Sequence, residues 1–126
     1  MGRILIVDDS ELMRKKLAFI FEQENHEIVG QAENGLEAIK LFKDKKPDLI
    51  TMDLTMPVMD GIEAIKEIIQ IDPLATIVVC SAMGQQKIIV KAIKEGAKDF
   101  IIKPFHEELV IETIHNIFQS YKQTKE

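Results

Sequence analysis

The sequence predicts an α/β fold in which one parallel five-stranded sheet carries helices on both faces. Apolar, β-rich runs alternate with segments of helical period along the whole chain, and the apolar runs show no polar alternation. Strands that alternate with helices form parallel sheets, because each helix returns the chain to the edge where the strand began. With 126 residues and no linker, repeat or low-complexity segment, we expect residues 1–126 to form a single domain.

Each strand is expected from a short run of branched apolar residues. In chain order these runs are Ile4–Val7, Ile28–Gly30, Leu49–Met52, Thr76–Cys80 and Phe100–Ile102. The first is continuously apolar, which is typical of a strand buried on both faces. The run at Ile28 is the weakest, so we expect that strand at the edge of the sheet.

The helices are expected from apolar stripes and from capping patterns between these strands. The first helix is expected to begin at about Ser10 and the second to span Asn34–Phe42. The third begins at Asp60, the fourth spans Gln86–Glu95, and the last occupies the stretch around Leu109–Phe118. The second and third open with capping-box patterns, Asn-Gly-Leu-Glu and Asp-Gly-Ile-Glu. Pro47 ends the second segment, and Gly96 is the expected C-cap of the fourth.

Composition excludes several classes of protein. The net charge of −5 gives no basic surface for nucleic acid, and charged or amide residues interrupt every apolar run before it reaches the length of a membrane span. The first residues leave no room for a signal peptide, and the single cysteine, Cys80, rules out an internal disulfide framework. We expect a cytoplasmic monomer without membrane insertion or direct nucleic-acid binding.

Polar residues close four of the five predicted strands. Asp8 and Asp9 follow the first strand, Asp53 the third, Ser81 the fourth, and Lys103 with Pro104 the fifth. The carboxyl ends of parallel strands meet at one edge of the sheet, where ligands of such folds bind. We therefore expect these side chains to converge.

The chemistry of the four strand ends is mutually compatible. Carboxylates at ~4 Å repel by about 4 kcal/mol per pair at an effective dielectric near 20, so the cluster favours a cation. Mg²⁺ prefers such oxygen ligands, while Lys103 and the Ser81 hydroxyl can each approach a phosphoryl oxygen. A carboxylate nucleophile beside a metal and a lysine is a site for an aspartyl phosphate. Taken singly, these residues would be no more than turn and cap residues; their combination predicts the site.

The chain resembles the response-regulator receiver family over essentially its whole length. The resemblance rests on Ile-Val-Asp8-Asp9, Met52-Asp-Leu-Thr-Met-Pro57, Asp60-Gly61, Ser81-Ala82, Gly96-Ala97 and Phe100-Ile-Ile-Lys-Pro-Phe105. It implies a flavodoxin-like, CheY-like doubly wound sheet with strand order 2-1-3-4-5. Within the family, the stretches Cys80–Gln86 and Lys98–Phe105 are similar to the stand-alone CheY-type chemotaxis regulators of Gram-positive systems.

The resemblance also implies a role for each site residue. Asp53 is the expected phosphoacceptor. Asp9, Asp53 and the Thr55 backbone carbonyl are expected to bind Mg²⁺ (or Mn²⁺) directly, and Asp8 through water. Lys103, before an expected cis peptide bond to Pro104, should contact the phosphoryl group. Ser81 and Phe100 occupy the positions of a hydroxyl and aromatic switch pair, and Thr55 and Met83 are expected to tune dephosphorylation.

The function implied is that of a response regulator rather than an enzyme acting on other molecules. A CheA-like sensor histidine kinase would phosphorylate it, and a flagellar motor switch protein or another phosphorylation-dependent target, with a possible phosphatase, would bind it. A phosphorelay intermediate and an isolated receiver of a DNA-binding transcription factor remain alternatives, although we expect no output domain. An aspartyl-phosphate phosphatase is disfavoured because Asp53 is followed by Leu54-Thr55, so the second Asp of the Asp-x-Asp pair of haloacid-dehalogenase-type enzymes is missing. Neither a P-loop nor a dinucleotide-binding glycine motif occurs.

Overall fold

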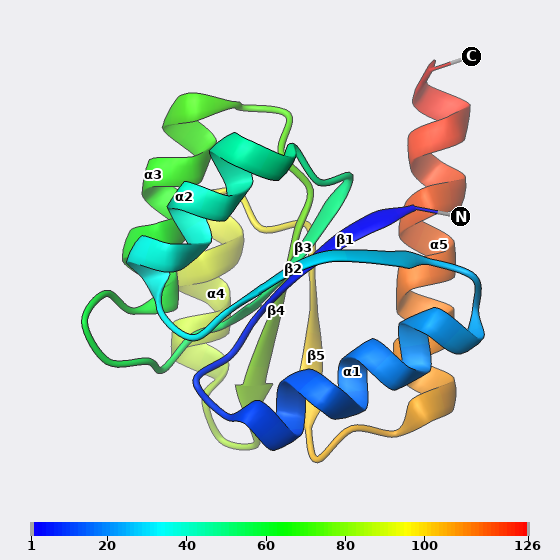
Figure 1. Ribbon diagram of the computed structural model, residues 1–126. Coiled ribbons are helices and arrows are strands. Elements are labelled where there is room, and N and C mark those ends of the chain that lie inside the picture. The colour runs from blue at the N-terminus through cyan, green and yellow to red at the C-terminus, as the bar shows by residue number, and fades with distance from the viewer. Residues whose placement is uncertain (1, 126) are drawn as a thin grey trace.

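Five parallel strands and five helices alternate along the chain, as Figure 1 shows. The computed structural model describes residues 2–125, with side chains described through residue 120. The strands are β1 (Arg3–Val7), β2 (Glu27–Ala32), β3 (Leu49–Asp53), β4 (Ile77–Ala82) and β5 (Asp99–Lys103). The helices are α1 (Glu11–Gln23), α2 (Gly35–Lys45), α3 (Gly61–Ile71), α4 (Gln86–Glu95) and α5 (Glu107–Lys125). All strand pairs are parallel in the order β2-β1-β3-β4-β5, so the predicted fold class and strand order are confirmed.

The predicted helix starts are capped as the sequence patterns indicated. The side chains of Ser10, Asn34 and Asp60 each accept a hydrogen bond from the backbone N–H three residues later. The helix predicted to end at Phe42 continues to Lys45 and stops at Lys46, which adopts the left-handed conformation with φ 48°. The C-terminus of α2 is therefore set by the left-handed backbone of Lys46, one residue before Pro47.

The strands extend beyond the predicted apolar runs at the edge that matters for function. Asp53, Ser81 and Lys103, expected to end their strands, lie within β3, β4 and β5. Asp53 is in register with Cys80, and Ser81 with Ile102. Inter-strand hydrogen bonding thus extends to the polar residues and fixes their backbone positions.

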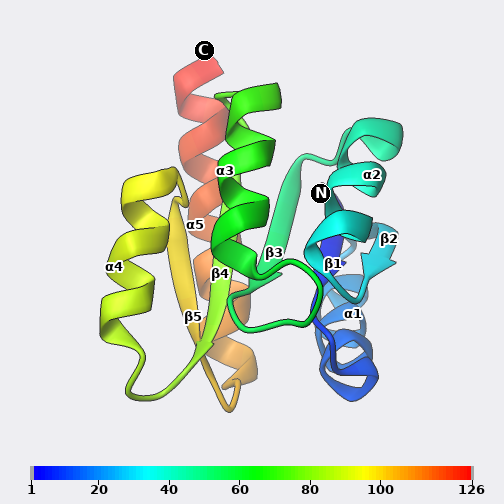
Figure 2. The same cartoon turned by 90° about the vertical axis from the view of Figure 1, so that its left-hand side faces the viewer.

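The sheet separates two apolar clusters, which explains why its strands are apolar on both faces. One cluster fills the space between the sheet and α2, α3 and α4, and the other lies beneath α1 and α5. Figures 1 and 2 show these helices on opposite faces. In Figure 2 the loops that follow β1, β3, β4 and β5 all lie toward the lower end of the sheet. Among the described helices, none carries an apolar stretch long enough to cross a bilayer.

Thr51, in the middle of β3, offers a direct test of this core. Its side chain is 0% exposed, and Oγ1 is the one buried side-chain polar atom of the described residues without a hydrogen-bond partner. A buried hydroxyl without a partner costs about 1–3 kcal/mol. Thr51→Val keeps the shape and removes that group, so we expect the free energy of unfolding to rise by about 1 kcal/mol in urea denaturation.

The matched control for this variant is Thr76→Val, because Thr76 is only partly buried just before β4. Water can solvate its hydroxyl, so that exchange should change stability by no more than about 0.5 kcal/mol. A Thr51→Val variant that is less stable than the wild type would mean that the Thr51 hydroxyl has a partner.

Candidate functional site

Three carboxylates meet at the carboxyl ends of β1 and β3. Asp8 and Asp9 follow β1 directly, and Asp53 is the last residue of β3. Oxygen atoms of the three side chains all lie within 4.8 Å of one another. Asp8 and Asp53 are buried, with 1% and 6% exposure, while Asp9 is exposed. The convergence predicted for these residues is therefore present.

Lys103, the last residue of β5, places its ammonium group between two of these carboxylates. Its Nζ lies 2.8 Å from Asp8 Oδ2 and 3.5 Å from Asp53 Oδ1. The peptide bond that follows, to Pro104, is cis, as the resemblance implied. The fourth strand end predicted to be part of the site, Ser81, makes no hydrogen bond to this group.

Backbone contacts hold the two buried carboxylates in place. The Ser10 N–H donates to Asp8 Oδ1 at 2.9 Å, and the Thr55 N–H donates to Asp53 Oδ1 at 3.4 Å. The Arg14 side chain donates to the backbone carbonyl of Asp8 at 2.7 Å. Arg14 was not identified from the sequence, although a cation in the first turns of the helix that follows an acidic pair is a usable signal.

Burial and like charges change the protonation of this group. Burial is the largest cause that raises the pKa of Asp53, to about 6, and the Asp8 carboxylate adds to it. The Lys103 ammonium and the Thr55 N–H act in the opposite direction but do not cancel the rise. For Lys103, burial favours the neutral amine, yet the hydrogen bond to Asp8 and the Asp53 charge outweigh it and raise its pKa.

The donor set suits a hard divalent cation. Three carboxylates face one ammonium group, so negative charge remains in excess once all are ionised. All of the side-chain donors are carboxylate oxygens, and Mg²⁺ commonly takes one or two carboxylates while it keeps several waters. Asp9, as the exposed member, is open to a hydrated ion. The role of the Thr55 backbone carbonyl as a further ligand stays a prediction.

Ser81 is buried at the end of β4 and bonds to a residue that the sequence did not single out. Its hydroxyl lies 2.5 Å from Gln85 Oε1, and the same oxygen accepts the Ala82 N–H at 3.0 Å. Gln85 is the N-cap residue of α4, which has no side-chain capping bond, so Ser81 does not cap this helix. No sequence pattern could have revealed Gln85, because its contact depends on the path of the β4–α4 loop.

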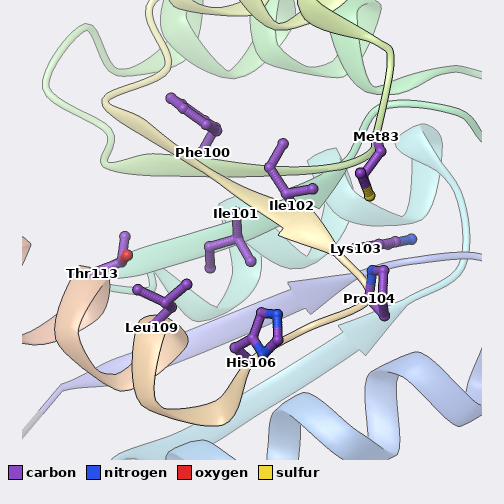
Figure 3. Close-up of a pocket in the computed structure, with 9 residues that line it drawn as sticks. All are labelled: Met83, Phe100, Ile101, Ile102, Lys103, Pro104, His106, Leu109 and Thr113. Atoms are coloured by element: carbon purple, nitrogen blue, oxygen red, sulfur yellow. The ribbon is translucent and has the colours of Figure 1, made fainter.

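Phe100 and Met83 lie beside the site rather than in it. The Phe100 side chain is 44% exposed and that of Met83 is 75% exposed. Both line a surface pocket of about 320 Å³ between β5 and α5, which Figure 3 shows together with Lys103 and Leu109. In that view Phe100 and Lys103 lie toward opposite ends of β5. The aromatic partner expected for Ser81 is therefore turned outward in this structure.

Comparison with known proteins gives a consistent result. Residues 4–115 match the family model described as the response regulator receiver domain. The chain is 54% identical over 115 residues to the chemotaxis protein CheY of Thermotoga maritima, covering 91% of this chain and 96% of that protein. It is 54% identical over 113 residues to CheY of Bacillus subtilis, covering 90% and 94%. The fold matches the crystal structure of the CheX–CheY–BeF3–Mg²⁺ complex from Borrelia burgdorferi with a TM-score of 0.88 and 36% identity, covering 92% of this chain and 88% of that one.

Proposed function

The chain belongs to the response regulator receiver domain family, and we propose that Asp53 is the residue that accepts its phosphoryl group. The protein is a two-component response regulator closely related to the CheY chemotaxis regulators. The observation that carries the assignment of Asp53 is the position of Lys103 Nζ, 2.8 Å from Asp8 and 3.5 Å from Asp53. A nucleophilic carboxylate beside a fixed ammonium group and two further carboxylates is suited to phosphoryl transfer.

In the proposed reaction a carboxylate oxygen of Asp53 attacks the phosphorus atom of a phosphohistidine on a sensor kinase. The new P–O bond forms as the P–N bond breaks, and the imidazole leaves with the electron pair and takes a proton from solvent. Lys103 stays beside the acceptor and neutralises charge on the phosphoryl oxygens. Mg²⁺ or Mn²⁺, held by Asp8, Asp9, Asp53 and the Thr55 carbonyl, would supply further neutralisation of that charge when bound.

The test of this proposal is phosphorylation of the full chain by acetyl phosphate. We expect the mass of one phosphoryl group to be added in the presence of Mg²⁺ and little to be added with a chelator. Borohydride reduction of the acyl phosphate, followed by peptide mapping, should place the modification at Asp53. Labelling at another aspartate, or labelling that needs no divalent cation, would contradict the proposal.

Asp9→Ala tests the metal site. Asp9 is the exposed carboxylate of the cluster, and removing it takes away a ligand without opening a cavity. We expect the Mg²⁺ affinity to fall by about tenfold or more. Because the sequence contains no Trp, calorimetry or NMR titration is the appropriate measurement.

The matched control for Asp9→Ala is Glu11→Ala. It removes the same charge two residues away, from an exposed side chain that faces Lys15 at 3.4 Å. Unlike the loss of Asp9, this exchange should leave Mg²⁺ affinity within about twofold of the wild type, because an exposed pair contributes little. An equal loss of affinity in both variants would indicate a general charge effect rather than a ligand at Asp9.

We further propose that phosphorylation reaches a partner through Ser81 and Phe100. Ser81 would move to the phosphoryl group, and Phe100, now 44% exposed, would turn inward. Burying an aromatic ring can contribute about 1.5–3 kcal/mol, enough to shift a closely balanced equilibrium by tenfold or more. Thr55 and Met83 are proposed to flank the path of the water that hydrolyses the acyl phosphate.

The proposed partners are suggested by the CheY relatives, and the pocket between β5 and α5 is the surface on which a target would bind. A CheA-like sensor kinase would donate the phosphoryl group, and a flagellar motor switch protein would bind the phosphorylated surface. The Borrelia burgdorferi complex pairs CheY with CheX, which supports a further protein partner for this chain. We propose a phosphatase as one such partner. Matches that span nearly the full length of the CheY relatives support a role like theirs, and we propose that the protein acts as a stand-alone cytoplasmic monomer.

A further inference from the structure

The single proton of the Ser81 hydroxyl is committed to the side-chain amide of Gln85. Ser81 Oγ lies 2.5 Å from Gln85 Oε1, and the Ala82 N–H donates to the same oxygen at 3.0 Å. A backbone N–H can only donate, so its contact fixes which atom of the amide faces Ser81. The hydroxyl must then be the donor in the shorter bond. Its proton is directed to Gln85 and not to the carboxylates.

We propose that Gln85 is a positioning residue that holds Ser81 in the resting arrangement and has to release it before Ser81 can donate to a phosphoryl group on Asp53. This inference rests on the proposed function of Asp53 and deepens it. A hydroxyl has one donor proton, so a bond to Gln85 and a bond to a phosphoryl oxygen exclude each other. Gln85 therefore biases the equilibrium toward the unphosphorylated arrangement.

The same amide oxygen links the hydroxyl to the β4–α4 loop. Gln85 is the residue before α4 but makes no capping bond there; its oxygen reaches back to the Ala82 N–H. Between them the chain reverses at Gly84, which has φ 87°. Release of Ser81 thus also frees the backbone of the loop that carries Met83, one of the residues that line the pocket in Figure 3. The hydroxyl and the loop change together because they share one acceptor.

The experiment measures the affinity of the Mg²⁺-saturated full chain for beryllofluoride, an anion that mimics a phosphoryl group. Gln85→Met keeps the side-chain length and removes the acceptor. Since the acceptor of both the Ser81 hydroxyl and the Ala82 N–H is then lost from the resting arrangement alone, we expect beryllofluoride to bind about three- to tenfold more tightly. Gln86→Met is the matched control, because this neighbouring glutamine is exposed and has no side-chain hydrogen bond in the described structure. Its affinity should equal that of the wild type.

A double-mutant cycle separates the proposed role from a merely structural one. If Gln85 acts through the Ser81 hydroxyl, most of the tightening caused by Gln85→Met should disappear in a Ser81→Ala background, where only the bond from the Ala82 N–H is left to lose. If Gln85 only orders the loop, the tightening will persist without the hydroxyl, and the positioning role is overturned. Gln85→Ala is measured in parallel, and the proposal requires both folded variants to shift in the same direction.

Failure of this inference can be distinguished from failure of the proposed function. A wild-type chain that binds no beryllofluoride in the presence of Mg²⁺ would overturn the role of Asp53, and the role of Gln85 with it. Normal binding by the wild type together with unchanged affinity in Gln85→Met would overturn only the role of Gln85.

Discussion

Asp53→Asn is expected to abolish phosphoryl acceptance and, at the same time, to stabilise the unphosphorylated fold. The amide keeps the shape of the carboxylate but is not a nucleophile, so acetyl phosphate with Mg²⁺ should add no phosphoryl mass. The pKa of Asp53 is raised from 3.8 to about 6, chiefly by burial and by the Asp8 carboxylate. Ionising this group in the folded chain at neutral pH therefore costs stability, of the order of 1–3 kcal/mol, a figure that already includes the attraction to Lys103.

The pH dependence of this gain has a defined sign. Because the folded pKa is raised, the protonated carboxyl favours the folded state, and that contribution is fully present below about pH 4. It is lost as the pH rises through about 6. The advantage of Asp53→Asn over the wild type in urea denaturation without divalent cation should therefore be small at about pH 4 and largest above about pH 7.

Asp44→Asn provides the control for both effects of the Asp53 exchange. Asp44 is exposed on α2, so this variant should accept phosphate normally and differ in stability by no more than about 0.5 kcal/mol. Stoichiometric labelling of Asp53→Asn would refute the acceptor role. A stability gain that does not depend on pH would refute the electrostatic explanation of it.

Gly61→Ala is expected to destabilise the fold by about 3 kcal/mol and to slow phosphorylation strongly. Gly61 begins α3 directly beneath the end of β3, and a Cβ atom there would lie 2.3 Å from the backbone oxygen of Asp53 and 2.8 Å from Leu54 Cα. Both are backbone atoms, so neither can yield by a side-chain rotation. The methyl group must displace the β3–α3 loop, which carries the Thr55 N–H bound to Asp53.

Gly30→Ala distinguishes this steric effect from the general cost of replacing a glycine. In β2 the new Cβ would meet only the ends of two side chains, Leu5 Cδ1 at 3.3 Å and Leu41 Cδ1 at 3.5 Å, and both side chains can adjust. We expect a change of less than about 1 kcal/mol and an unaltered rate of phosphorylation by acetyl phosphate. If Gly61→Ala were as mild as Gly30→Ala in denaturation and labelling experiments, the close approach of α3 to the acceptor would have no functional role.

The parts of the site that could be predicted are those that depend on strand ends alone. Alternation of apolar runs and helices predicts a parallel sheet, and a parallel sheet brings Asp8, Asp53 and Lys103 to one edge whatever the loops do. The order of the strands could not be predicted in this way, because periodicity does not determine which strands are neighbours. The predicted order came from the resemblance to the receiver family.

The contacts that could not be predicted depend on loop paths and on long side chains. Arg14 reaches the Asp8 carbonyl, and Gln85 reaches the Ser81 hydroxyl, only because the intervening turns have particular dihedral angles. The outward position of Phe100, which is 44% exposed, depends on its rotamer, and composition and spacing do not encode the rotamer. Sequence reasoning thus identified the charged groups but not the residues that hold them.

The contact between Lys103 and Asp8 spans 95 positions of the chain, which has a consequence for the order in which the protein is made. At about 5–20 residues per second, a ribosome takes several seconds to add the segment between Asp53 and Lys103. A nascent chain that has released β1 and β3 but not β5 carries the acceptor without the cation that neutralises it. If Asp53 is the acceptor, competence to take a phosphoryl group is therefore acquired only after Lys103 has been added and β5 has joined the sheet.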